Sequence, residues 1–356
     1  MIPAARPIIG EDERAAVDAV LRSGMVAQGP EVAAFEAAFA EIVAGRECVA
    51  VNSGTSALHL SLLALGIGRG DEVIVPSFTF AATANAVALT GARPVFVDIE
   101  PDYFCMDPEA VRAAIGPRTA AIMPVHLYGH PADMPAIVGL AEKRGLAVIE
   151  DAAQAHAASL GGVPVGAFGT AAAFSFYPTK NMTSAEGGMV VSADPEVARK
   201  VRLLRNQGME QRYRNELVGL NNRMTDIHAA IGRVQLGKLP VWTTARQANA
   251  AFLDRNLSGV ATPSAAPGAV HVYHQYTIRV RDRDDFVAAL AEQGVGSGVY
   301  YPVPVHSLES FGLDLDLPQT AKAASEVVSL PVHPALSQAD LERVAAGVNA
   351  VVGGGS

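Results

Sequence analysis

Short apolar runs alternate with amphipathic segments through the first two thirds of the chain. Such runs, rich in β-branched residues and bounded by turn residues, predict buried strands. They fall at residues 47–51, 72–76, 94–97, 121–125, 146–149, 171–176 and 189–192. The segments between them have helical periodicity, for example from a cap at Asp133 to Arg144. Continuous apolar strands separated by amphipathic helices indicate an α/β fold with a mainly parallel, seven-stranded sheet covered on both faces.

The last third has a different pattern. Residues 225–256 are predicted to be helical, with a break near Pro240 because proline lacks the backbone N–H that a helix needs. Further strands are predicted at 274–280 and 295–301, and further helices at 284–293 and 338–351. This mixture indicates a smaller α+β unit. We therefore predict a large domain at 1–240, a small C-terminal domain at 241–352, and a flexible tail at 353–356.

Composition narrows the possible partners and location. The chain has 356 residues, half of them apolar, and a formal net charge of −9, which disfavours nucleic acid and acidic membranes as partners. We expect Cys48 and Cys105 to be buried, reduced thiols. The N-terminus lacks a secretory pattern and no apolar run has membrane-spanning length, so we expect a cytoplasmic protein.

Several polar stretches follow directly on predicted strands. In a parallel sheet, ligands collect at the carboxyl ends of the strands, so these stretches are expected to meet at one edge. They are residues 52–56, 77–80, 126–130 and 151–156. The nine histidines show neither HxH nor HExxH spacing, and no GxSxG motif is present. Metal catalysis and serine hydrolysis are therefore disfavoured, and we expect no metal.

Lys180 and Asp151 narrow the chemistry most. Lys180 follows the predicted strand 171–176, and Asp151 ends an earlier strand. Taken singly, each is more often a surface lysine or a turn cap, but a lysine between two buried strands and beside an acid is poorly explained by solvation. Pyridoxal 5′-phosphate (PLP) needs this pair: an amine for a Schiff base and a carboxylate that keeps its pyridine nitrogen protonated.

The surrounding residues fit the same cofactor. Gly54 lies in a strand–turn–helix junction, where free N–H groups and the helix dipole favour an anion such as phosphate. Ser175 can add a hydroxyl to that anion, and Gln154 can bind the phenolic oxygen of the ring. Phe80 can stack on the ring face, although a phenylalanine is more often part of the core. Junctions of this kind also use Ser, Gly and Thr merely as helix caps.

Taken together, these motifs resemble the DegT/DnrJ/EryC1/StrS family of PLP-dependent sugar aminotransferases. Six runs, in order along nearly the whole chain, carry the resemblance: Asn52–Leu58, Pro76–Asn85, Glu150–Ala155, Ser175–Lys180 with Glu186–Gly188, Gly219–Gly232, and Tyr301–His306. The resemblance implies the fold-type-I transferase fold. It also implies a homodimer whose active sites lie at the subunit interface.

The resemblance assigns roles to individual residues. Lys180 would carry PLP as a Schiff base, Asp151 would contact the pyridine nitrogen, Gln154 would face the phenolic oxygen, and Phe80 would stack on the ring. Three hydroxyl side chains would hold the phosphate: Thr55, Ser56 and Ser175. Asn221 would reach the phosphate of the neighbouring subunit. Two residues match positions near the sugar nucleotide: Tyr301 and His306.

The implied reaction transfers an amino group from L-glutamate to a keto group of a nucleotide-linked sugar, as in polysaccharide or antibiotic sugar biosynthesis. Lys180, rather than histidine, disfavours the sugar dehydratases of the family. The alternatives are an aminotransferase for a ketocyclitol or another keto substrate, a PLP lyase, and a non-catalytic sensor with this fold. The nucleotide, the sugar, and amination at C3 or C4 stay open. Ala185 precedes Glu186–Gly188 where relatives carry glycine, which leaves the local backbone geometry open as well.

Overall fold

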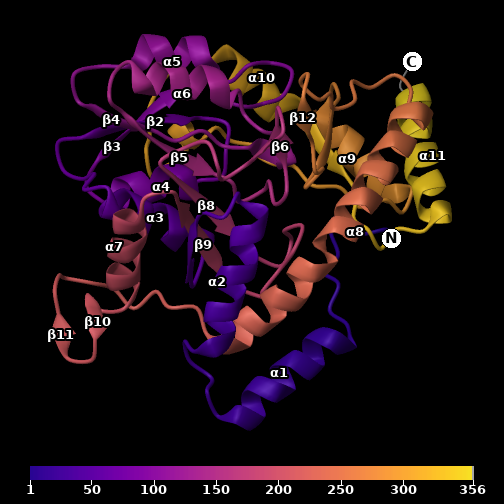
Figure 1. Cartoon of the computed structure of the whole chain (residues 1–356). Coiled ribbons are helices and arrows are strands. Elements are labelled where there is room, and N and C mark those ends of the chain that lie inside the picture. The colour runs from indigo at the N-terminus through magenta and orange to yellow at the C-terminus, as the bar shows by residue number, and fades with distance from the viewer. Residues whose placement is uncertain (355–356) are drawn as a thin grey trace.

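The computed structural model describes residues 1–354. A seven-stranded sheet with the order β1-β9-β8-β5-β4-β2-β3 forms the centre of its larger part (Figure 1). The strands are β1 (Glu47–Val51), β2 (Glu72–Pro76), β3 (Arg93–Val97), β4 (Thr119–Ile122), β5 (Ala147–Asp151), β8 (Ala171–Ser175) and β9 (Gly188–Ser192). Only β9 runs antiparallel to its neighbours, β1 and β8. The mainly parallel, seven-stranded sheet predicted from the sequence is confirmed.

Helices cover both faces of the sheet (Figure 1). They are α2 (Pro30–Ile42), α3 (Gly54–Ala64), α4 (Ala82–Leu89), α5 (Pro108–Ala114), α6 (Met134–Glu142) and α7 (Pro195–Arg205). Successive strand residues face opposite sides: Val73 and Val75 pack with α3, α4 and α7, whereas Ile74 packs with α5 and α6. Since both faces are buried, the strands read as continuous apolar runs rather than alternating ones.

A single long helix, α8 (Asp226–Asn256), joins the sheet to the C-terminal part. We expected a break at Pro240, and this was wrong: the helix continues through the proline. Pro240 removes one backbone hydrogen bond, but both halves of the helix are anchored in cores. Leu236 and Leu239 pack in a hydrophobic cluster with residues of α2 and the central sheet. Leu253 packs in the hydrophobic core of the C-terminal part. Because α8 crosses position 240, the two-domain division remains our proposal.

The C-terminal part consists of a two-stranded sheet and helices. Its elements are β13 (Tyr276–Arg279), β14 (Val327–Leu330), α9 (Arg283–Glu292), α10 (Pro318–Glu326) and α11 (Gln338–Gly354). The predicted strand 295–301 does not form. Val295 bridges Ile2 and Gly298 bridges Ser329, so this segment contacts two different neighbours instead of building one ladder. The helix α11 includes residues 353 and 354 of the predicted tail, and the rest of that tail lies outside the described residues.

The remaining helix, short strands and turns complete the fold. They are α1 (Glu11–Ser23), β6 (Ser159–Leu160), β7 (Val163–Pro164), β10 (Met209–Gln211), β11 (Arg214–Asn215), β12 (Ala269–Val270), and the 3₁₀ turns η1 (Leu127–Gly129) and η2 (Val305–Ser307). The β10–β11 hairpin projects from the body below α7 (Figure 1). Cys48 and Cys105 are buried and unpaired, as predicted. Within residues 1–354, no helix is both long enough and apolar enough to cross a membrane.

Candidate active site

Loops at the carboxyl ends of the strands surround a cavity of about 470 Å³. The loops after β1, β2, β5 and β8 contribute to it. Three of the four predicted strand-end stretches therefore reach the cavity, whereas residues 126–130 do not line it and only Val125 just before them does. Eight of the eleven candidate residues line this cavity: Gly54, Thr55, Phe80, Asp151, Gln154, Ser175, Lys180 and Tyr301. Residues from positions 54 to 301 are thus brought to one site.

Lys180 lies in the loop between β8 and β9 and is half-buried. Its backbone N–H donates to the carbonyl of Tyr177 at 2.9 Å, which fixes the turn that carries it. Burial lowers the pKa of its amine to about 8, while the charge of Asp151 opposes this shift. Roughly a tenth of the amine is therefore unprotonated at pH 7, far more than for an ordinary lysine, and this free base is what a nucleophile or general base requires.

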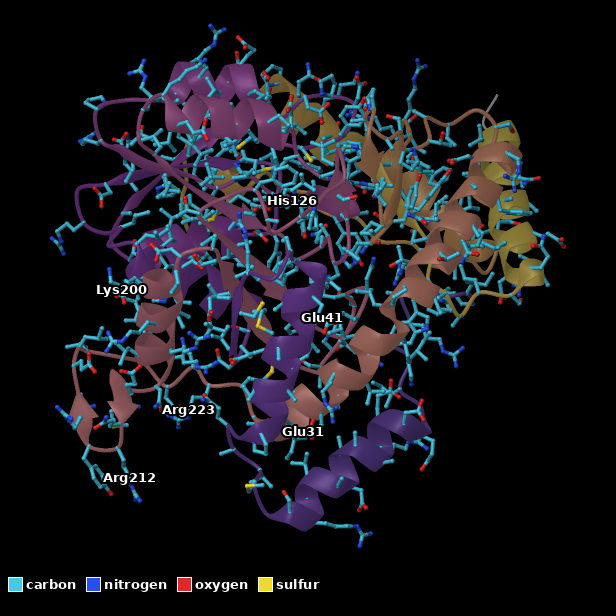
Figure 2. All side chains as sticks on the ribbon, viewed as in Figure 1. Glu31, Glu41, His126, Lys200, Arg212 and Arg223 are labelled. Carbon is cyan, nitrogen blue, oxygen red and sulfur yellow. The ribbon has the colours of Figure 1, made fainter. Side chains whose placement is uncertain are left out.

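Asp151 is the last residue of β5 and is 5% exposed. Its Oδ2 accepts a hydrogen bond from Thr83 Oγ1 at 2.8 Å, and its Oδ1 accepts one from the backbone N–H of Ala153 at 3.2 Å. Burial raises the pKa of this carboxyl, while those two hydrogen bonds, Lys180 and His126 lower it. His126 lies in the interior (Figure 2), and its backbone N–H donates to the Asp151 carbonyl at 3.0 Å.

The turn from β1 into α3 forms one end of the cavity. Ser53 caps the helix, accepting a hydrogen bond from the Ser56 N–H at 3.1 Å. At the first helical position, a Cβ on Gly54 would lie 2.7 Å from Ser175 Cβ, so the close approach of the two loops requires glycine here. The first-turn N–H groups of Gly54 and Thr55 have no partner within the helix and so are suited to an anion.

The aromatic wall differs from a packed core. Phe80 is 58% exposed, which excludes the alternative that it is a core residue. Its ring centroid lies 5.8 Å from that of Tyr301. Gln154 is held at both ends of its amide: Oε1 accepts from the Tyr128 N–H at 2.7 Å, and Nε2 donates to Tyr301 Oη at 3.0 Å. One Nε2 hydrogen therefore remains for a ligand.

Three candidate residues do not line this cavity. Ser56 points its hydroxyl at Ser53, 3.0 Å away. His306 is buried against Phe96, and its Nδ1 lies 2.6 Å from Ser77 Oγ, so the structure does not place its side chain on the cavity. Asn221 lies beyond the β10–β11 hairpin, bridged to Asn206, and its expected role toward a neighbouring subunit stays a prediction.

The structure adds residues that sequence reasoning missed. His274, Tyr300, Tyr177 and Glu186 line the cavity. Tyr177 lies within the run Ser175–Lys180 and Tyr300 directly precedes Tyr301, so the sequence held a signal for both, whereas no spacing rule connects His274 to Lys180. Glu186 belongs to the run Glu186–Gly188 that carries the family resemblance, so the sequence could have pointed to it as a site residue. Among residues 1–354 there is no group of three or more His, Cys, Asp or Glu side chains able to hold a metal ion.

Ala185 resolves the geometry that the sequence left open. It adopts φ 68°, the left-handed region that glycine occupies at no cost and alanine does not. We expect Ala185→Gly to stabilise the protein by about 0.5–1 kcal/mol, because relief of this strain exceeds the added entropy of the unfolded chain. Urea unfolding measures it. The control is Ala15→Gly, within helix α1, which should destabilise the protein by about 1 kcal/mol. Destabilisation by both changes would contradict the backbone strain inferred at Ala185.

The lowered pKa of Lys180 has a consequence for stability. In the cofactor-free protein the folded state releases the lysine proton at about pH 8, whereas the unfolded chain holds it to about 10.5. The unfolded state therefore binds more protons in this window, so the free energy of unfolding rises with pH there. We expect Lys180→Met to lack this increment. Urea unfolding of both proteins from pH 7.5 to 10.5 tests it, and parallel pH profiles would contradict it.

The sheet order, the covered faces and a site at the strand ends define the fold-type-I transferase fold. A family model described as the DegT/DnrJ/EryC1/StrS aminotransferase family matches residues 7–349. The chain belongs to this family and is an aminotransferase.

Relatives with sugar-nucleotide names cover most of the chain. The dTDP-3-amino-3,4,6-trideoxy-α-D-glucose transaminase of Streptomyces venezuelae is 45% identical over 93% of this chain and 89% of its own length. The UDP-N-acetyl-3-dehydro-α-D-glucosamine 3-aminotransferase of Acidithiobacillus ferrooxidans is also 45% identical, over 89% of this chain and 87% of its own. The resemblance inferred from the motifs is thereby confirmed.

Solved structures support the same family assignment. DesV of S. venezuelae, in complex with a ketimine intermediate, matches with a TM-score of 0.93 and 44% identity, covering 96% of this chain and 94% of DesV. NtdA of Bacillus subtilis, with bound cofactor PMP, matches with a TM-score of 0.89 and 32% identity, covering 97% and 83%.

Proposed function

We propose that this aminotransferase uses PLP to transfer an amino group from L-glutamate to the C3 keto group of a nucleotide-linked sugar. The observation that carries the proposal is one cavity lined by Lys180, Asp151 and the Gly54 turn together. The donor set fits PLP: an amine of lowered pKa, a buried carboxylate and an anion-binding turn. The PMP-bound relative supports the choice of cofactor.

Each residue has a distinct part in this proposal. Gly54 and Thr55 at the start of α3, together with Ser175, hold the phosphate, whereas the Ser56 hydroxyl is paired with Ser53. Phe80 and the free Gln154 hydrogen orient the ring. Bound PLP supplies an electron sink that weakens the C–H bond of the amino substrate.

Lys180 and Asp151 handle the charges and protons. Lys180 takes the proton from the donor Cα and returns it at the cofactor carbon, because its lowered pKa makes both the free base and the ammonium accessible. Asp151 holds a proton on the ring nitrogen, since an opposite charge favours the charged form. Tyr301 borders the space left for substrate and orients Gln154 through its hydroxyl.

Charge supports a second copy of the chain at this site. Among the described lining residues Lys180 is the one Lys or Arg, whereas Asp151 and Glu186 are both acids. PLP phosphate and a nucleotide diphosphate bring several further negative charges. The segment after β11 carries Asn221 and Arg223, and Figure 2 shows Arg223 near the base of the projecting hairpin. In a homodimer this segment supplies Asn221 to the partner's phosphate.

The substrate class comes from the relatives. Both named transaminases concern carbon 3 of the sugar, one on dTDP and the other on UDP. The carbon is therefore common to them while the nucleotide differs, and the proposal commits to C3 and leaves the nucleotide to experiment.

Two measurements on the purified protein test this function. Adding PLP should produce a visible absorbance band that L-glutamate bleaches as 2-oxoglutarate appears. Glutamate consumption should then follow with 3-keto sugar nucleotides on dTDP or UDP and not with ketocyclitols. Absence of the visible band would refute the cofactor, and turnover of ketocyclitols alone would refute the substrate class.

A further inference from the structure

Thr83 lies behind Asp151 and outside the cavity. It occupies the first turn of α4, is fully buried, and is not among the lining residues. Its Oγ1 lies 2.8 Å from Asp151 Oδ2 and 3.0 Å from the hydroxyl of Thr79, which does line the cavity. Nothing on the cavity side explains why a buried hydroxyl is aimed at this carboxylate.

The chemistry of the three groups fixes the direction of the chain. An ionised carboxylate only accepts hydrogen bonds, so Thr83 must give its single hydroxyl hydrogen to Asp151. The contact between the two threonines must then run from the Thr79 hydroxyl to Thr83. We propose that Thr83 is a positioning residue that orients the Asp151 carboxylate and keeps it ionised, with Thr79 reinforcing the bond from the cavity wall. This inference rests on the proposed PLP function.

The Thr83 hydroxyl opposes the effect of burial on the ionisation of Asp151. Asp151 ends a buried strand, and burial favours its neutral form. The titratable groups that face it are Lys180, from the loop after β8, and His126, from the loop after β4. The Ala153 N–H holds Oδ1 and Thr83 holds Oδ2, so both oxygens have a fixed donor before any ligand binds. Hydrogen bonds to a charged acceptor are about twice as strong as neutral ones.

Three variants test the proposal. Thr83→Val keeps the shape and removes the hydroxyl, Thr83→Ser keeps the hydroxyl, and Thr79→Val removes only the reinforcing donor. The matched control is Thr320→Val in α10, because Thr320 is also fully buried and its hydroxyl has no partner within the described residues. The same methyl-for-hydroxyl exchange there should leave cofactor and kinetics unchanged.

The readouts are the pH titration of the visible band of bound PLP, and kcat with KM for the amino donor. Loss of a charge-assisted hydrogen bond corresponds to about a ten- to hundredfold lower kcat for Thr83→Val. The band's apparent pKa should rise, since a ring nitrogen that loses its proton no longer lowers the pKa of the lysine-linked nitrogen. Thr83→Ser should restore both, and Thr79→Val should have a smaller effect in the same direction.

Each outcome decides something different. If Thr83→Val binds PLP and matches the wild type in band pKa and kcat, the positioning role is refuted while the function stands. If Thr83→Val lowers only the unfolding midpoint, the hydroxyl is structural and the role is again refuted. If the wild type itself shows no PLP band, the proposed function fails, and this result is seen before any variant is made.

Discussion

Replacing Lys180 with alanine is expected to abolish aminotransfer while the protein keeps its fold. The variant loses the one lysine among the described lining residues, and with it the group that moves a proton between donor and cofactor. Removing a general acid–base group alone costs about 10²–10⁴-fold in rate, and the covalent attachment is lost as well. We therefore expect turnover at least about 10³-fold below the wild type. Glutamate-dependent formation of 2-oxoglutarate measures it.

Lys180→Arg is the control for charge. Arginine retains a positive charge near Asp151 but is not deprotonated in proteins, so it cannot accept the donor proton. Both variants should be inactive, while circular dichroism and the unfolding midpoint of Lys180→Ala should stay at or above wild type, because a partly desolvated amine is removed. Turnover by either variant above about a tenth of wild type would exclude Lys180 as the proton-transfer group.

The sheet and the central pair were predictable for one shared physical reason. Strands buried on both faces must be apolar throughout, so a charged residue at the end of such a strand, as Asp151 is, or in the short loop between two of them, as Lys180 is, is conspicuous. The carboxyl-edge rule then brings distant loops together without any knowledge of distances. Those two steps suffice to predict the central pair and three of the loops that line the cavity.

Sequence-based prediction fails for features that are set by tertiary contacts rather than by the local sequence. Pro240 costs the helix one hydrogen bond, but cores on both sides of it hold α8 together, which local propensity cannot show. His306 sits in a quoted motif, yet a motif gives position in the chain and not the direction of a side chain, and here Ser77 holds the ring. Thr83 reads as an ordinary helical residue until its contact with Asp151, 68 positions away, is known.

Replacing Asp151 with asparagine should separate catalysis from folding. Asparagine has nearly the same shape but no charge, so nothing opposes loss of the proton from the cofactor ring nitrogen. Removing one partner of a buried, hydrogen-bonded charge pair typically costs a few kcal/mol, which corresponds to about 10²–10³-fold in kcat. Stopped-flow absorbance of the glutamate half-reaction gives the rate of the affected step directly.

Glu150→Gln is the matched control, one residue earlier on the same strand. Successive strand residues face opposite sides, and Glu150 points away from the cavity, where it accepts backbone N–H bonds from Gly166, Phe168 and Gly169 at 2.7–2.9 Å. This change should lower stability by about 1–3 kcal/mol, because a buried acceptor set loses its charge, and should leave the rate of the half-reaction unchanged. Asp151→Asn should instead lower the rate of the half-reaction and leave stability largely unchanged. If Asp151→Asn reacts within threefold of wild type, or if both variants lose only stability, Asp151 is a structural acid and the site must place another group at the ring nitrogen.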